Sequence, residues 1–148
     1  MKNKFSLIGK EVIQSEIDAL KKLKKTINKD FDKIVNSILK CKGKIVLSGV
    51  GKSGIISKKI SSTLSSLGIP SFYVDAGSCS HGDLGQISSN DVLILVSFSG
   101  ESAELKNIIQ YANRNKKITL IGIMSKKNSR SFGLFLVSNS GVKFFSYA

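Results

Sequence analysis

Apolar residues follow two different spacings in this chain of 148 residues, and the spacing changes near residue 44. In the first third they recur every three or four positions, which predicts an amphipathic helix with its lysines facing water. The residues of this stripe are Val12, Ile13, Ile17, Leu20, Leu23 and Ile27. Asp30 is the expected N-cap of a second helix, which would end before Gly43 and turn Ile34, Val35, Ile38 and Leu39 inward. We therefore expect residues 1–43 to form a helical hairpin that either packs on the core or serves as a subunit interface.

From residue 44 onward, short apolar runs alternate with helical patterns. Strands are predicted at 45–47, 72–74, 92–96, 118–123 and 134–137. One intervening helix would bury Ile55, Ile56, Ile60, Leu64 and Leu67, and another would run from 105 to 112. This alternation predicts an α/β fold in which a parallel sheet lies between helices, with right-handed crossovers. Residues 44–148 would form this core within one domain overall, although 141–148 lack a helical period and a cap and suggest an interrupted C-terminus.

The net charge of +13 comes almost entirely from lysine. Arginine, the preferred residue for bidentate recognition of phosphates and bases, occurs only at Arg114 and Arg130, which argues against a nucleic-acid-binding protein. Over half of the excess charge lies in the first 44 residues, where twelve lysines accompany five acids. Solvated helix faces are the preferred interpretation, and a basic docking face for nucleic acid or an anionic membrane is the alternative.

The two cysteines, Cys41 and Cys79, are too few for a disulfide framework, and neither belongs to a CxxC motif. No stretch approaches the roughly 20 apolar residues that span a bilayer, and the N-terminus lacks the apolar core of a signal peptide. We expect a soluble cytoplasmic protein with no membrane contact.

A glycine-rich turn spans Gly49 to Gly54 and fits GxGxxG, directly after a predicted strand and before a predicted helix. Asp75 follows about twenty residues on, which is the setting of a dinucleotide-binding turn. A sugar-phosphate loop and a plain tight turn are the other two interpretations. A Walker A loop is excluded, because its first glycine would have to stand where Val46 stands.

The only histidine, His81, lies among glycines and serines in the long loop 76–90. A lone loop histidine is usually a surface residue, but this loop follows a strand at the edge where open α/β sheets bind ligands. A catalytic role and a surface role therefore carry similar weight. The loop alone cannot form a zinc site, because the chain has no second histidine and Cys79 is unsuitably spaced.

A polar octet, Ser97 to Glu104, follows the most apolar strand and opens a helix. Its hydroxyl groups and the free N–H groups of a helix start suit a phosphate monoester. The simpler alternative is helix capping, with Ser99 or Gly100 as the N-cap and the acids favouring the positive helix end. Capping would leave two of the three serines without a role, so a ligand is the favoured interpretation.

Three segments, GVGKSG, GSCSHGDLG and SFSGESAE, together resemble the sugar isomerase (SIS) domain family, and within it the arabinose-5-phosphate isomerases of lipopolysaccharide and capsule synthesis. The resemblance runs from about Gly9 to Ser138. It implies a five-stranded parallel sheet of flavodoxin-like type in a three-layer αβα sandwich, assembled as a homo-oligomer, a dimer or tetramer. It also implies reversible conversion of ribulose 5-phosphate to arabinose 5-phosphate, the precursor of Kdo, with no nicotinamide or other cofactor and no metal. The dinucleotide interpretation becomes the least favoured one.

The resemblance also assigns roles. Glu104 matches a catalytic carboxylate, Lys52 a lysine that steadies negative charge, and His81 a histidine suited to ring opening or proton relay. The phosphate would be held by Ser97, Ser99 and Ser102 around Gly100, and the other side of the sugar phosphate would be lined by Gly49, Gly51 and Ser53. Glu101 is a second candidate for the base, with helix capping as its alternative role.

Other family features are not found in this sequence. Family members continue through EAC…LAPTSST, GDALA and SHPGG segments that carry a second catalytic glutamate and histidine, often followed by CBS domains. Phe98 also stands where the family usually has asparagine. Two hypotheses follow: an aldose–ketose isomerase, or a catalytically deficient module that binds phosphosugars and regulates or pairs with an intact enzyme.

Overall fold

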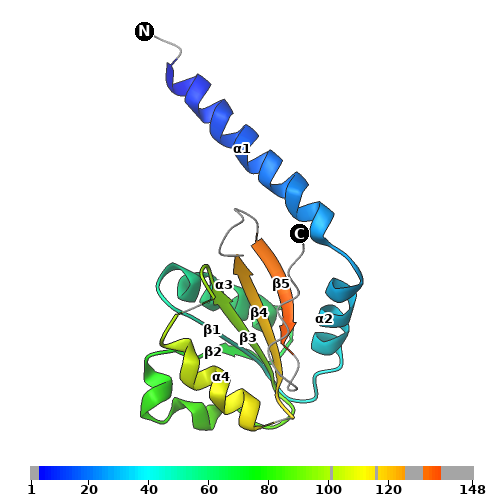
Figure 1. Ribbon diagram of the computed structural model, residues 1–148, viewed down its shortest axis with the longest axis vertical. Helices are drawn as coiled ribbons and strands as arrows, with labels where there is room; N and C mark the ends of the chain where they lie inside the picture. The colour runs from blue at the N-terminus through cyan, green and yellow to red at the C-terminus, as the bar shows by residue number, and fades with distance from the viewer. Residues whose placement is uncertain (1–3, 101, 116, 126–131, 138–148) are drawn as a thin grey trace.

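The computed structural model describes residues 4–100, 102–115, 117–125 and 132–137 (Figure 1). Two helices, α1 (Lys4–Thr26) and α2 (Lys29–Leu39), precede an alternating series of strands and helices. That series is β1 (Ile45–Gly49), α3 (Lys52–Ser66), β2 (Ser71–Tyr73), the 3-10 turns η1 (Ser78–His81) and η2 (Asp83–Gln86), β3 (Val92–Ser97), α4 (Leu105–Arg114), β4 (Thr119–Ser125) and β5 (Phe132–Val137). All five predicted strands and both predicted core helices are present.

The strands form one sheet in the order β2-β1-β3-β4-β5. The first four are parallel, which confirms the predicted α/β class and gives the flavodoxin-like order of a doubly wound sheet. β5, however, pairs with β4 in the antiparallel direction, so the expectation of five parallel strands is corrected at this edge. Only residues 126–131 separate β4 from β5, whereas a parallel return needs a connection of about a dozen residues or more.

Helices cover both faces of the sheet. On one face, Ile34 of α2 packs with Ile45, Leu47 and Ile121 of the strands, and Ile60 of α3 joins this cluster. The other face is covered by α4 and by the loop that carries η1 and η2, through residues that include Leu105, Ile108, Cys79 and Ile87. β1 and β3, which lie between these layers, are buried on both sides, as their continuous apolar sequences predict.

Helix α3 contacts the sheet through a different face from the one predicted. Ile60 and Leu64 are half-buried as expected, but Ile55, Ile56 and Leu67 are exposed. The buried positions of α3 are instead the small residues Gly54, Ser57 and Ser61. Small side chains allow the helix backbone to approach β1 closely, and the Ser57 hydroxyl donates to the Ser48 carbonyl at 3.2 Å.

The N-terminal helices are not folded against each other as a hairpin. Figure 1 shows α1 running away from the body, and none of its residues is buried. α2 packs on the sheet through Ile34, while Leu39, which was expected to face inward, is exposed. The N-cap of α2 is Asn28 rather than Asp30, because the Asn28 side chain accepts the Asp30 amide at 2.8 Å. Within the described ranges, no helix is both long and apolar enough to cross a membrane.

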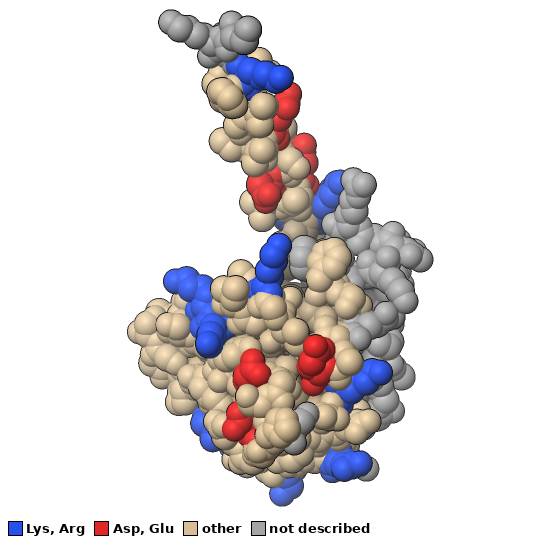
Figure 2. Space-filling model, turned by 90° about the vertical axis from the view of Figure 1, so that its left-hand side faces the viewer, with Lys and Arg blue, Asp and Glu red and all other residues tan. Residues whose placement is uncertain are grey.

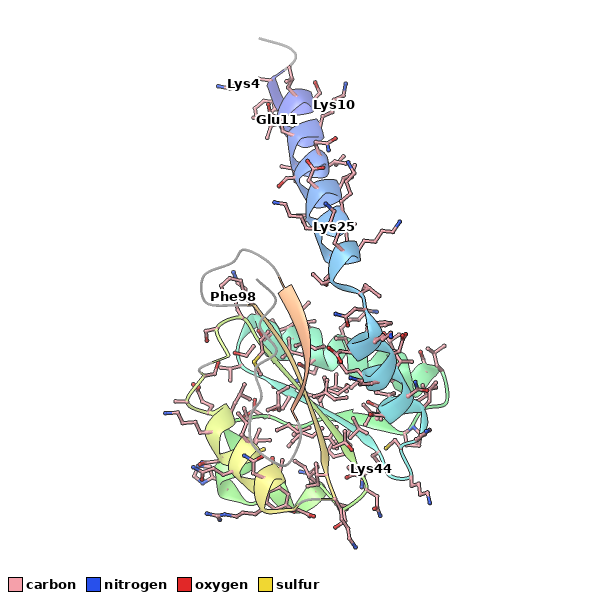
Figure 3. The ribbon with its side chains drawn as sticks, turned by 45° about the vertical axis from the view of Figure 1, so that its right-hand side comes forward. Lys4, Lys10, Glu11, Lys25, Lys44 and Phe98 are labelled. Carbon is pink, nitrogen blue, oxygen red and sulfur yellow. The ribbon has the colours of Figure 1, made fainter. Side chains whose placement is uncertain are left out.

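Asp91, which precedes β3, connects neighbouring strands at the edge of the sheet where the parallel strands begin. Its buried carboxylate accepts the backbone amides of Lys44 and Ser88 at 2.8 and 2.7 Å. The Lys44 ammonium, at the start of β1 (Figure 3), lies 4.0 Å from the same carboxylate and 5.8 Å from the centre of the Phe72 ring. These contacts hold β1, β2 and β3 together at their amino ends.

Candidate functional site

The three motifs of the sequence follow three neighbouring strands at the same edge of the sheet. β1 lies between β2 and β3, and Gly49 at the end of β1 is in register with Val96 near the end of β3. The glycine turn and the serine loop therefore leave the sheet side by side, while the histidine loop leaves from β2. Because the strand order reverses between β1 and β3, this is the crevice where open α/β sheets bind ligands.

The glycine turn is shaped by close contacts between backbones. A Cβ on Gly49 would lie 2.8 Å from the Val96 carbonyl oxygen, and a Cβ on Gly54 would lie 2.7 Å from the Gly49 carbonyl oxygen. Gly51 has φ +56°, a conformation that favours glycine. Lys52 then begins α3 with an exposed side chain, and Ser53 is half-buried beside it. The turn thus presents a helix start, with its free N–H groups, at the crevice.

The serine loop is held by hydroxyl groups. Ser97 is buried at the end of β3, and its Oγ accepts the Gly100 amide at 3.0 Å and lies 3.1 Å from the Ser102 Oγ. Gly100 has φ +72°, and a Cβ there would lie 3.0 Å from the Met124 sulfur. Ser97 therefore shapes the loop, which is a role that its spacing alone did not reveal.

The remaining octet residues lie around this turn. Ser99 and Glu104 are exposed, Ser102 is half-buried, and Phe98 projects from the end of β3 with its side chain exposed (Figure 3). The N-cap of α4 is Glu104, in helical conformation and without a side-chain capping bond, so neither Ser99 nor Gly100 caps this helix. Glu101 lies outside the described residues.

The histidine loop begins at Asp75, whose Oδ1 accepts the backbone amides of Gly77 and Ser78 at 2.9 and 3.1 Å. These bonds, that of Ser78 foremost, hold the pKa of the Asp75 carboxyl below its usual value. In a dinucleotide-binding turn, this aspartate would bind a ribose hydroxyl. Here its carboxylate instead closes its own loop.

Further along this loop, Cys79 and His81 lie in different environments. Cys79 is 2% exposed and belongs to the core, and burial raises the pKa of its thiol to about 11, with the charges of Asp83 and Asp75 adding to the effect. His81 is exposed at the end of η1, and Gly82 ends that turn with φ +118°. Among the residues described, no cluster of three or more His, Cys, Asp or Glu side chains is placed to hold a metal ion.

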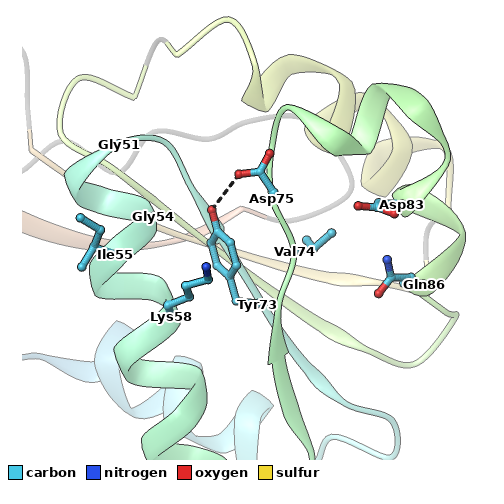
Figure 4. A pocket seen from close by; sticks show the side chains of 9 residues that line it. All are labelled: Gly51, Gly54, Ile55, Lys58, Tyr73, Val74, Asp75, Asp83 and Gln86. Atoms are coloured by element: carbon cyan, nitrogen blue, oxygen red, sulfur yellow. Dashed lines mark hydrogen bonds between the residues drawn. The ribbon is translucent and has the colours of Figure 1, made fainter.

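Tyr73, at the end of β2, connects the histidine loop to the glycine turn. Its hydroxyl lies 3.1 Å from the Gly49 carbonyl oxygen and 3.3 Å from Asp75 Oδ2 (Figure 4). Burial, followed by the negative charge of Asp75, raises the pKa of the Tyr73 hydroxyl. The Lys58 ammonium lies 5.4 Å from the centre of the Tyr73 ring. Sequence reasoning missed this residue, although an aromatic hydroxyl two positions before the loop aspartate was a usable signal.

A pocket of about 420 Å³ opens between the start of α3, the end of β2 and η2. Figure 4 shows its lining residues, among them Gly51, Lys58, Asp75, Asp83 and Gln86. The side chains of Asp83 and Gln86 have no hydrogen-bond partner among the described residues, so both could bind the hydroxyl groups of a ligand. Of the predicted site residues, Gly51 alone lines this pocket, which includes no residue of the serine loop.

Comparison with known proteins agrees with this geometry. The SIS domain model matches residues 38–131. RP505 of Rickettsia prowazekii (strain Madrid E) is 46% identical over 127 residues, which are 86% of this chain and 40% of that protein. The arabinose 5-phosphate isomerase KdsD of Yersinia pestis is 43% identical over 125 residues, 84% of this chain and 38% of that protein.

Among solved structures, the Escherichia coli CFT073 protein c3406, in complex with arabinose 5-phosphate, superposes with a TM-score of 0.70 at 34% identity. That match covers 88% of this chain and 68% of the other. This chain spans about two fifths of the length of the curated relatives it matches. The matched domain, the strand order and the three loop motifs agree, and the chain belongs to the SIS domain family.

Proposed function

We propose that this chain binds a pentose phosphate at the carboxyl edge of β1 and β3 and interconverts ribulose 5-phosphate and arabinose 5-phosphate. The observation that carries the proposal is the convergence of the glycine turn and the serine loop on neighbouring strand ends at the point where the strand order reverses. The likeness to KdsD and to c3406 in its sugar-phosphate complex supports the choice of substrate.

The phosphate would bind against the serine loop and the start of α4. Ser99 and Ser102 would donate hydroxyl hydrogen bonds, while Ser97 and Gly100 would hold the loop that presents them. The start of α3, with Gly51 and Ser53, would line the opposite side. Because Gly49 has no side chain, the end of β1 lies close to the end of β3. Two helix starts facing one ligand suit an anion.

Aldose–ketose isomerisation moves one proton between C1 and C2 and needs no net oxidant. In this proposal Glu104 removes the proton from C2 of the open-chain aldose and returns it to C1, with Glu101 as the alternative base. The exposed ammonium of Lys52 stabilises the negative charge of the enediolate. His81, exposed on the neighbouring loop, transfers the proton that opens the sugar ring or relays it between oxygens.

The family likeness also supports two wider roles. An arabinose 5-phosphate product would supply the synthesis of Kdo for lipopolysaccharide or capsule, in the cytoplasm. The chain would act as a homo-oligomer, with sites assembled close to the subunit interface.

The test measures turnover and binding separately. Purified chain is incubated with ribulose 5-phosphate and the formation of arabinose 5-phosphate is followed, while calorimetry measures binding of arabinose 5-phosphate. We expect Lys52→Ala and Glu104→Gln to reduce turnover at least about a hundredfold. Matched controls are Lys59→Ala, on the same helix, and Glu11→Gln, on α1, both exposed and outside the three loop motifs. Unchanged rates in the first pair would contradict the assigned roles.

A second candidate function is a phosphosugar-binding module without turnover. It is favoured by one observation, that the pocket beside the glycine turn is lined by none of Lys52, His81 and Glu104. Saturable binding without turnover would support the module, and Ser99→Ala should weaken that binding. If the chain does not bind the sugar phosphate at all, both candidates are wrong.

A further inference from the structure

The serine loop, Ser97 to Glu104, contains no lysine or arginine, and the glycine turn contains only Lys52. Figure 2 shows the described Lys and Arg side chains scattered among uncharged residues over one face of the molecule, without a concentrated basic patch. A phosphate at the serine loop would therefore depend on protons donated by hydroxyl and backbone amide groups. How these groups share their protons decides how well the loop can bind an anion.

One buried hydroxyl close to the end of β1 has no partner. Ser48 is 0% exposed, and its Oγ is the only buried side-chain nitrogen or oxygen among the described residues that makes no hydrogen bond. A hydroxyl that is buried without a partner costs free energy, so such a group in a folded protein normally marks a bound water, an ion or a functional role.

The register of the sheet shows on which side this hydroxyl lies. Ser48 pairs with Leu95, which belongs to the apolar cluster on the α4 side of the sheet. Side chains along a strand alternate between the two faces, so Ser97, two positions after Leu95 in β3, lies on that side as well. The hydroxyls of Ser48 and Ser97 are therefore on neighbouring strands and on the same face of the sheet.

The Ser97 hydroxyl has room for one more hydrogen bond. Its Oγ accepts the Gly100 amide at 3.0 Å and lies 3.1 Å from the Ser102 Oγ, where either hydroxyl can be the donor. A hydroxyl has one proton and two lone pairs. A donor at the second lone pair of Ser97 would direct the Ser97 proton to Ser102, and the Ser102 proton would then be available to a ligand.

We propose that Ser48 is a positioning residue that supplies this donor through one buried water. Ser48 donates to the water, the water to Ser97, Ser97 to Ser102, and Ser102 to an oxygen of the bound phosphate. Hydrogen bonds that all point the same way polarise one another, so the last of them, to the anion, is strengthened. This inference rests on the proposed function only in placing a phosphate at the serine loop.

The first experiment measures binding. Ser48→Ala and Ser48→Cys should each raise the dissociation constant for arabinose 5-phosphate, measured by calorimetry, about three- to tenfold. Inorganic phosphate, titrated by NMR, should show the same ratio, because the hydrogen bonds end on the phosphate. Cysteine keeps the volume of the side chain but is a weak donor, so it separates the loss of a proton donor from the creation of a cavity.

Ser57→Ala is the matched control. Ser57 is also 0% exposed, but it belongs to α3, which packs on the other face of the sheet, and its Oγ donates to the Ser48 carbonyl. Ser57→Ala should lower the urea midpoint and leave the dissociation constant unchanged. If Ser48→Ala instead raised the urea midpoint and bound both ligands as the wild type does, Ser48 would be an unpaired hydroxyl without a role, and the proposal would be overturned.

The second experiment needs no ligand. Hydrogen exchange followed by NMR reports on the Gly100 amide, which donates to Ser97. Ser48→Ala should raise the exchange rate of this amide about three- to tenfold, and Ser57→Ala should not raise it selectively. An unchanged Gly100 rate in Ser48→Ala would overturn the proposal whether or not the chain binds a sugar phosphate. Faster exchange in a chain that binds no arabinose 5-phosphate would support the link between Ser48 and Ser97 and contradict only the proposed function.

Discussion

The glycine turn after β1 and the serine loop after β3 occupy equivalent places on neighbouring strands but are built by opposite means. The glycine turn depends on missing side chains, since Gly49 and Gly54 lie where a Cβ would meet backbone atoms at 2.7–2.8 Å. The serine loop depends on a side chain that is present, because Ser97 Oγ accepts the Gly100 amide and contacts Ser102. One wall of the site is thus specified by steric fit and the other by hydrogen bonds.

The glycine turn should therefore tolerate substitutions less well than the serine loop does. Gly54→Ala should destabilise the fold by about 2–3 kcal/mol, because the new methyl group would meet the Gly49 carbonyl and the Tyr73 hydroxyl. Urea denaturation followed by circular dichroism measures the change. Gly9→Ala is the control, since nothing lies within 4 Å of that position in α1, and it should be neutral or stabilising. Equal stabilities of the two variants would mean that the turn is not sterically restricted.

Removing the hydroxyl of the serine loop should have a smaller but measurable effect. Ser97→Ala leaves the Gly100 amide without its hydrogen-bond acceptor in a half-buried place, and should cost about 1–2 kcal/mol. It should also weaken binding of sugar phosphate through the altered loop. Ser99→Ala, two residues away and exposed, should leave stability within about 0.5 kcal/mol while still weakening binding. If Ser97→Ala left the free energy of unfolding unchanged, the serine loop would not depend on the hydrogen bonds of Ser97.

The smallest effect concerns the connection between the glycine turn and the histidine loop. Tyr73→Phe removes the hydroxyl near Gly49 and Asp75 and should cost about 0.5–1.5 kcal/mol at pH 7. Because the pKa of Asp75 is lowered in the folded chain, the stability contributed by its bonds is present above the ordinary aspartate pKa and is lost as the pH falls through the lower folded value. The difference in free energy of unfolding between wild type and Tyr73→Phe should therefore become smaller as the pH falls. A difference that stays constant from pH 7 to well below the folded-state pKa of Asp75 would exclude a contribution from the bond to Asp75.

The sequence predicted the strands and the three loops because each has a strong local signal. Val92 to Val96 are a continuous run of strand-forming residues, which predicts a buried strand. The three motifs agree with the matched SIS domain. It did not predict which face of α3 is buried, since Ile55 and Leu67 have a helical spacing but Gly54 and Ser57 allow the closest approach to the sheet. Periodicity locates apolar side chains, whereas close packing of a backbone is decided by small ones.

Two further differences come from the way a short connection or turn directs the backbone. The direction of β5 depends on the short connection after Ser125 and not on its own apolar residues. The role of Ser97 depends on where Gly100 and Ser102 are brought by the turn. Local patterns carry neither kind of information, so the candidate ligands were identified from sequence while the residues that position them were not.

β1 lies between β2 and β3, and this position has a consequence for the order in which the protein folds. Its pairing with β2 closes a segment of 26 residues, as the Ser71–Ile45 bond shows, whereas the contact between Lys44 and Asp91 beside β3 closes 47. Loop closure costs more entropy for the longer segment, so we expect the β1–α3–β2 unit to form before β3 joins it. Pulse-labelling hydrogen exchange would show protection of Val46 and Phe72 before that of Leu93, and simultaneous protection would contradict this order. Since the crevice needs both β1 and β3, the ligand site would be completed only after the β1–α3–β2 unit has formed.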